Sequence, residues 1–188
     1  MTAFDYLSVL ISIVLGLSIT QLLGGFAAMV RARDRLTFYW PHLVQMLALF
    51  LINVQVWWAL FGLRDMQHWT FAGFFVILMQ PVTLYMMSAF LTPDIPARER
   101  MDLRAFYFRE KTWFFAATLA TLMVSLIKDF FVMNGPIGLA DFIGHGVFIA
   151  LSFLGLLSNR DGVQKFIAPV TLLAYCTYIG LLFVTLPR

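Results

Sequence analysis

The sequence is built from long apolar runs, each separated from the next by charged residues. A bilayer core about 30 Å thick needs roughly 20 apolar residues to be crossed by one helix. The chain has six runs of about this length or longer, at residues 4–30, 36–63, 69–92, 112–133, 137–158 and 165–186. We therefore predict an all-α, polytopic integral membrane protein, in which a six-transmembrane-helix bundle with short loops forms a single domain over residues 1–188.

The composition supports the bilayer as the solvent. Hydrophobic residues make up 61% of the 188 residues and charged residues only 12%, too few to cover the surface of a water-soluble domain. The single cysteine, Cys176, lies inside an apolar run, which excludes an intramolecular disulfide and a thiolate metal cluster. The basic residues flank apolar runs and form no basic patch on a polar domain, so we expect membrane lipids and no nucleic acid as partners.

The distribution of basic residues predicts how the chain is oriented. Ten of the 13 Lys and Arg residues lie in the connections after the first, third and fifth runs, namely Arg31, Arg33, Arg35, Arg98, Arg100, Arg104, Arg109, Lys111, Arg160 and Lys165. Connections rich in Lys and Arg stay in the cytoplasm. We therefore predict an inner (plasma) membrane protein with both termini on the non-cytoplasmic side. The longest connection, 93–111, is then a cytoplasmic connector, whose basic part from Arg98 to Lys111 could bind a cytoplasmic partner.

The first run carries a regular pattern of small residues. They recur at every fourth position, as Ser8, Ser12, Gly16, Thr20 and Gly24. Small residues at this spacing allow two helix backbones to approach closely in lipid. Two partners are open: another helix of the same chain, which we favour because six apolar helices must first pack on one another, or a second copy of the chain in a homo-oligomer.

Polar residues are placed unevenly along the apolar runs. Eight lie in the half of the membrane opposite the basic connections: Asp5, Asn53, Gln55, Lys128, Asp129, Asp141, His145 and Tyr178. The cytoplasmic half is nearly free of such groups. A Lys or Asp at the centre of a spanning helix costs roughly 2.5–3.5 kcal/mol, so these side chains should face each other or water. The pattern predicts a polar pocket that opens to the outer face.

The spacing of these residues suggests how they pair. Asp141 and His145 are four residues apart on one helix face, so the carboxylate can orient the imidazole and the pair could carry a proton. Lys128 and Asp129 are about 100° apart on a helix and should not both point into a narrow pocket. We expect Lys128 to pair with Asp141, or else with Asp5. Simpler roles stay open: Lys128 could snorkel, Asp141 could cap its helix and His145 could bind a backbone carbonyl.

Motifs for catalysis and for cofactor binding are absent from the sequence. A transmembrane haem usually needs two histidines at one depth, whereas His42 and His145 lie near opposite faces and His68 lies in a loop. The sequence contains no HExxH, nucleophile-elbow, phosphate-loop or dinucleotide motif. We therefore expect no metal and no cofactor, and the sequence leans against an enzyme.

Three functions remain compatible with the sequence. The first is movement of protons, ions or a small solute through the polar pocket. The second is a ligand-sensing or accessory membrane subunit that binds a cytoplasmic partner through residues 98–111. The third is a membrane enzyme acting on a lipid, with Asp141 or His145 as the acid or base.

Overall fold

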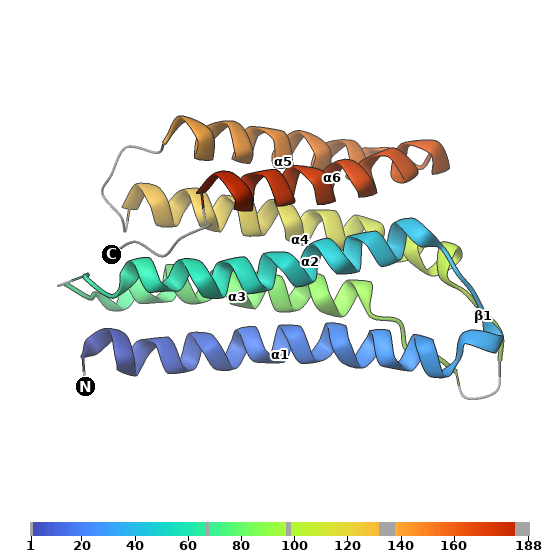
Figure 1. The fold of residues 1–188 in the computed structure, drawn as a ribbon, viewed down its shortest axis with the longest axis horizontal. Helices are drawn as coiled ribbons and strands as arrows, with labels where there is room; N and C mark the ends of the chain where they lie inside the picture. The colour runs from blue at the N-terminus through green and yellow to red at the C-terminus, as the bar shows by residue number, and fades with distance from the viewer. Residues whose placement is uncertain (1, 67, 97–98, 132–137, 183–188) are drawn as a thin grey trace.

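The computed structural model of this chain describes residues 2–66, 68–96, 99–131 and 138–182. Six α-helices fill most of these ranges, and each is long and apolar enough to cross a membrane. They are α1 (Ala3–Arg31), α2 (Trp40–Ala59), α3 (Phe71–Leu91), α4 (Leu103–Phe131), α5 (Leu139–Leu157) and α6 (Asp161–Leu182), with a 3-10 turn, η2 (Leu60–Leu63), that extends α2. The prediction of an all-α, multi-pass membrane protein with six spanning helices is confirmed (Figure 1).

The local sequence accounts for where several helices begin. Thr2 and Asp5 form a capping box at α1, because the Thr2 N–H donates to Asp5 Oδ2 (2.7 Å) and the Asp5 N–H donates to Thr2 Oγ1 (3.1 Å). Thr70 caps α3 by accepting a hydrogen bond from the Gly73 N–H at 3.1 Å. Pro41 lies in the first turn of α2, where the N–H that proline lacks would have no intrahelical partner.

Five of the helices form a closed ring. Each of α2, α3, α4, α5 and α6 packs against the next along the chain, and α6 packs against α2. Helix α1 lies outside this ring, on α3 and α2 (Figure 1). Successive helices run in opposite directions, so the bundle has two ends. We call the end with the α1–α2, α3–α4 and α5–α6 connections the basic end, and the end with the N-terminus and the last turn of α6 the terminal end.

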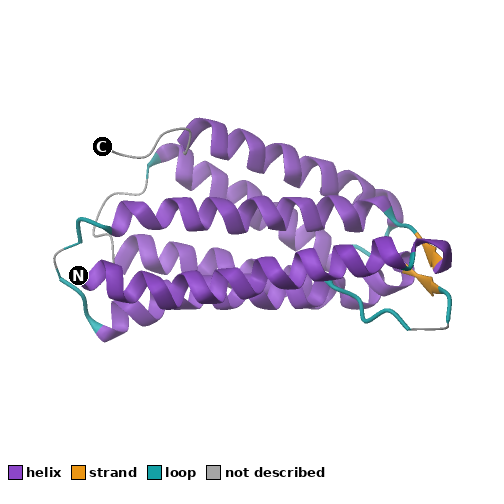
Figure 2. Cartoon of the chain, turned by 60° about the horizontal axis from the view of Figure 1, so that its bottom comes forward, coloured by secondary structure: helices purple, strands orange, loops and turns teal. Residues whose placement is uncertain are grey.

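A short two-stranded ladder ties two connections together at the basic end. The turn η1 (Arg33–Arg35) leads into β1 (Leu36–Thr37), which pairs in parallel with β2 (Met101–Asp102). Figure 2 shows this pair beyond the ends of the helices. Arg35 also donates from Nη1 to the Pro96 carbonyl at 3.1 Å. The long connection between α3 and α4 is therefore held against the connection between α1 and α2.

Helix α4 differs from its expected extent. It begins at Leu103, directly after β2, whereas the sequence predicted a connector that continues to residue 111. The added turns are helical because Leu103, Phe106 and Tyr107 are buried and continue the apolar face of the helix at helical spacing. With 29 residues, α4 is about 43 Å long at 1.5 Å per residue. The expected helix ends at 133, 137 and 186, together with Arg98, lie outside the described residues.

The small-residue pattern of α1 does not face the rest of the chain. The buried face of α1 consists of Ile11, Leu15, Ser18, Leu22, Gly25 and Met29. Gly16, Thr20 and Gly24 are exposed, and a Cβ added at either glycine would meet no atom within 4 Å. The favoured partner of this pattern, another helix of the same chain, therefore does not pack against Gly16, Thr20 or Gly24. The contacts to α3 come instead from Gly25, which lies against Thr92, and from Ser18.

Candidate functional site

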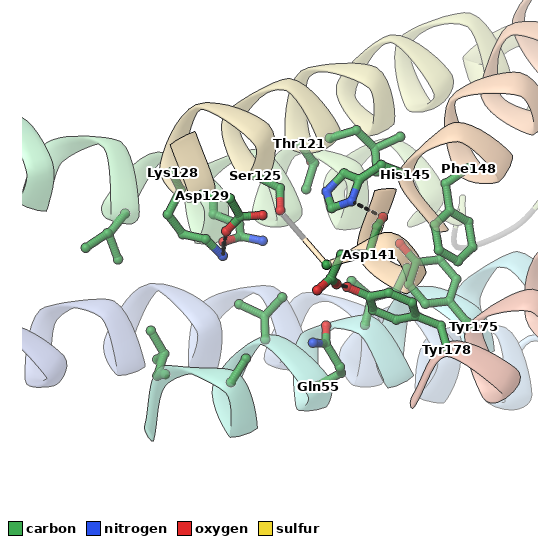
Figure 3. A pocket seen from close by; sticks show the side chains of 18 of the residues that line it. Gln55, Thr121, Ser125, Lys128, Asp129, Asp141, His145, Phe148, Tyr175 and Tyr178 are labelled. Atoms are coloured by element: carbon green, nitrogen blue, oxygen red, sulfur yellow. Dashed lines mark hydrogen bonds and ion pairs between the residues drawn. The ribbon is translucent and has the colours of Figure 1, made fainter. Parts of the chain in front are cut away.

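A cavity of about 430 Å³ lies inside the five-helix ring, toward the terminal end. This volume is in the range of small-molecule sites. All five helices of the ring contribute side chains to its wall (Figure 3). The polar lining residues are Gln55 from α2, Gln80 from α3, Thr121, Ser125, Lys128 and Asp129 from α4, Asp141 and His145 from α5, and Tyr175 and Tyr178 from α6.

Helical spacing explains why each helix presents these residues together. On α5, Asp141, His145 and Phe148 are separated by four and three residues and therefore share one face, which lines the cavity. The neighbouring Phe142 and Ile143 point away from the bundle and are 65% and 55% exposed. The helix is thus polar toward the cavity and apolar toward the surroundings, as expected for a helix with lipid on its outer side.

Lys128 and Asp129 form an ion pair with each other at the cavity wall. Lys128 Nζ lies 3.6 Å from Asp129 Oδ1 and donates to Gln80 Oε1 at 3.3 Å. The expectation that these neighbours could not both face the cavity is corrected, because both line it. The flexible four-carbon stem of the lysine bends its ammonium back toward the adjacent carboxylate, which an argument from ideal helix angles does not capture.

Asp141 is bound by a tyrosine and not by the expected lysine. Its Oδ1 accepts a hydrogen bond from Tyr178 Oη at 2.7 Å, which joins α5 to α6. His145 donates from Nδ1 to the Asp141 backbone carbonyl at 2.8 Å, so this contact between the two residues runs through the backbone and not the carboxylate. Within the described residues, Asp141 forms no ion pair with Lys128 or with any other cation.

Two of the eight polar residues singled out in the sequence lie away from the cavity lining. Asp5 caps the start of α1, is exposed, and lies on the helix outside the ring. Asn53 is fully buried and donates from Nδ2 to the Leu49 carbonyl of its own helix at 2.8 Å. The other six, Gln55, Lys128, Asp129, Asp141, His145 and Tyr178, line the cavity, as does Tyr175, which shares a face of its helix with Tyr178. Gln80, Thr121 and Ser125 are lining residues that the sequence did not single out for it.

The basic half of the bundle contains buried polar side chains, contrary to expectation. Lys111 is only 2% exposed, and its Nζ donates to the carbonyls of Gly155 at 3.2 Å and Leu156 at 3.0 Å. Gln164 donates from Nε2 to Gly155 O at 2.9 Å and accepts from Tyr107 Oη at 2.9 Å. These bonds satisfy carbonyls in the last turn of α5, which have no partner within the helix. The last turn of α5 is thereby held to α4 and α6.

The sequence missed these residues because Lys111 was counted as a connector charge. A signal was present: Lys111 lies four residues after Tyr107 and four before Phe115, on the buried face of α4. A lysine on an apolar helical face is an unusual placement, and it marks a buried partner.

A second group of polar residues links the starts of α2, α4 and α6 at the basic end. Asp161 accepts from Tyr39 Oη at 3.0 Å, and forms ion pairs with Arg104 Nε at 3.0 Å and Lys165 Nζ at 2.6 Å. Burial, together with the bond to this carboxylate, raises the pKa of the Tyr39 phenol, so Tyr39 stays a neutral donor. Two of the basic side chains predicted for the cytoplasmic connector, Arg104 and Lys111, thus serve contacts within the chain.

Aromatic rings separate the large cavity from a smaller one. The smaller cavity has a volume of about 20 Å³, enough for one water molecule, and lies toward the basic end. Ile52, Phe148 and Tyr175 line both cavities. The Phe148 and Tyr175 rings are stacked, with centroids 4.1 Å apart and planes at 22°. From the terminal end inward, the interior therefore runs from the large cavity through an aromatic partition to a single small void and then to the Lys111 and Gln164 contacts.

Comparison with known proteins adds no family. No protein-family model, no curated protein and no solved structure matches this chain. In the part of the chain that the structure describes, no group of three or more His, Cys, Asp or Glu residues could hold a metal ion.

Proposed function

We propose that this membrane protein moves a proton, an ion or a small solute across the membrane, through the interior of the five-helix ring. One observation carries the proposal: charged and hydrogen-bonding side chains from five helices converge on one cavity of about 430 Å³. Such groups are costly among apolar spanning helices, and where they persist they commonly mark a substrate or ion pathway. The cavity is the entry site in this proposal.

The lining residues take different roles. Asp141, which is bound only to a neutral phenol among the described side chains, contacts the transported cation. The Nδ1 atom of His145 is bound to the Asp141 carbonyl, and the imidazole lines the cavity, so its other nitrogen, Nε2, offers a hydrogen bond to a ligand. Lys128 and Asp129 balance each other's charge, and Gln55 offers neutral hydrogen bonds.

The proposal requires a change of shape. In this proposal the stacked Phe148 and Tyr175 rings and the polar contacts at the basic end form the barrier to passage. Substrate passage therefore requires α5 or α6 to shift against α4, as in transporters that open alternately to each side. A permanently open pore is not compatible with this interior.

The orientation and assembly belong to the same proposal. Arg31, Arg33 and Arg100 are exposed at the basic end, which supports an inner membrane protein with this end in the cytoplasm and both termini outside. The outward-facing small residues of α1 leave a homo-oligomer open as an assembly. The sensor alternative loses support, because Arg104 and Lys111 already have partners inside the chain.

Flux measurements in proteoliposomes test the proposal. Wild type, Asp141→Asn and Lys128→Gln would be compared for H⁺, Na⁺, K⁺ and Cl⁻ movement, after size-exclusion chromatography has shown that each variant is monodisperse. Asp34→Asn, which removes an exposed carboxylate in η1, is the matched control. We expect flux in wild type and the control and at least a tenfold loss in Asp141→Asn. Equal rates in Asp141→Asn and wild type would remove the cavity from the transport path.

A further inference from the structure

The charge balance of the large cavity favours a cation. Lys128 and Asp129 are paired at 3.6 Å and cancel each other. The remaining carboxylate, Asp141, receives one hydrogen bond from a neutral phenol and no ion pair within the described residues. The described lining therefore has one carboxylate more than it has ammonium groups. Asp141 is partly exposed and its carboxylate lines the cavity, so a cationic ligand gains a charge interaction there that a neutral or anionic ligand does not.

Three aromatic rings line the same cavity as this carboxylate. Tyr178 binds Asp141 through its hydroxyl, and its ring meets Phe148 edge-on, with centroids 6.0 Å apart and planes at 86°. The ring of Tyr175 stacks on the ring of Phe148. Phe148, Tyr175 and Tyr178 all line the cavity, and Figure 3 shows the two tyrosines beside Asp141. The faces of such rings attract cations, so a cavity lined by aromatic rings and a carboxylate is suited to an alkylammonium group.

The size and lining of the cavity favour an organic cation over a metal ion. A volume of about 430 Å³ is far larger than a bare ion needs. Calcium requires six to eight oxygen ligands, and the described lining offers one unpaired carboxylate. Ile52, Val56, Ile77 and Leu122 cover other parts of the wall and suit methylene or methyl groups.

We propose that this cavity binds an organic ammonium cation, with the charged nitrogen between the Asp141 carboxylate and the rings of Phe148, Tyr175 and Tyr178. The inference rests on the proposed function only in taking the cavity as the ligand site. Binding can be measured without flux, so the two proposals can fail separately.

Calorimetric titration of the full chain in nanodiscs tests the inference. The probes are choline, tetramethylammonium and benzylammonium, with 3,3-dimethylbutan-1-ol as the neutral isostere of choline. We expect at least one ammonium probe to bind, and choline, where it binds, to bind at least tenfold more tightly than its neutral isostere. Absence of binding by all three cations, or equal affinity for choline and the neutral isostere, would overturn the proposal.

Variants locate the bound cation. Asp141→Asn and Tyr175→Leu should each weaken ammonium binding at least tenfold, and Tyr178→Phe, which keeps the ring, should weaken it less than Asp141→Asn. Phe153→Leu, at an exposed aromatic residue of α5, is the matched control and should bind as wild type does. Binding that survives Asp141→Asn and Tyr175→Leu unchanged places the cation elsewhere and refutes the assignment. Ammonium binding without flux of the bound ammonium cation or of the inorganic ions in proteoliposomes would retain this inference and reject the transport proposal.

Discussion

Lys111 is the residue whose environment departs most from what its type leads one to expect. Its ammonium is buried and its hydrogen bonds go to two carbonyls in the last turn of α5. The C-terminal end of a helix carries partial negative charge, so a cation is stabilised there. The lysine therefore acts as a cap supplied by a different helix.

Removal of this cap should destabilise the protein. Lys111→Met keeps much of the side-chain volume but leaves the Leu156 carbonyl without the lysine donor. We expect a loss of about 1–3 kcal/mol of stability, seen as a lower apparent melting temperature in detergent. Arg109→Met, at a largely exposed position of the same helix, is the control and should change little. Equal melting temperatures for both variants would show that the buried bonds contribute nothing net.

Substitution by alanine should have different effects on stability at two adjacent glycines of α1, Gly24 and Gly25. A Cβ at Gly25 would overlap the Thr92 side chain, whereas a Cβ at Gly24 would meet no atom within 4 Å. Thr92 is not free to turn away at no cost, because its hydroxyl donates to the Ser88 carbonyl at 2.6 Å. We expect Gly25→Ala to cost about 1–3 kcal/mol and Gly24→Ala to be close to neutral, measured by thermal unfolding of the two variants side by side.

At the scale of elements, the junction of α5 and α6 at the basic end is held by side-chain hydrogen bonds from Gln164. Gln164 bonds to the Gly155 and Ser158 carbonyls and to Tyr107, so one side chain joins α4, α5 and α6. By contrast, β1 and β2 fix the connections on the α1 side of the bundle. If α5 or α6 moves during transport, these contacts at the basic end must break.

Hydrogen–deuterium exchange can test this role of Gln164. Gln164→Leu removes the bonds to two carbonyls and a phenol, so we expect the amides at the end of α5 to exchange at least tenfold faster. Thr177→Val, an exposed residue of α6 whose hydroxyl bonds only within its own helix in the described structure, is the matched control. Unchanged exchange in Gln164→Leu would mean that packing alone holds the junction.

At the scale of the whole molecule, the aromatic partition decides whether the interior is continuous. Phe148 and Tyr175 belong to the walls of both the large cavity and the small void. The barrier in the described structure is thus a pair of stacked rings followed by hydrogen-bonded side chains.

Removal of one ring should open a leak. Phe148→Ala deletes the ring that stacks on Tyr175. Loss of this ring should join the two cavities, so we expect a passive proton leak at least tenfold above that of wild type. A pH-sensitive dye trapped in proteoliposomes measures this rate. Phe153→Ala removes an exposed ring from the same helix and should leave the rate unchanged. A tight Phe148→Ala protein would place the barrier at the polar contacts of the basic end instead.

The six spans could be predicted from the sequence, and the gathering of polar side chains only in part. Hydropathy is a property of one segment, and a charge-free apolar segment of sufficient length has one stable form in a bilayer, a spanning helix. The same reasoning placed Asp141, His145 and Lys128 in one half of the membrane, and all three line one cavity. The start of α4 was predicted too late in the chain, because a basic segment with a buried face remains a good helix.

The sequence by itself therefore determined the number of helices and the approximate ends of most of them, and it predicted a depth for each polar residue. The tertiary structure alone decided which partners these residues have: Asp141 with Tyr178, Lys128 with Asp129 and Gln80, and Lys111 with the end of α5. It also decided that α1 stands outside the ring and that its small residues face outward. The reason is physical. Depth follows from distance along one helix, whereas partners depend on the order and rotation of helices, which contacts between distant segments set.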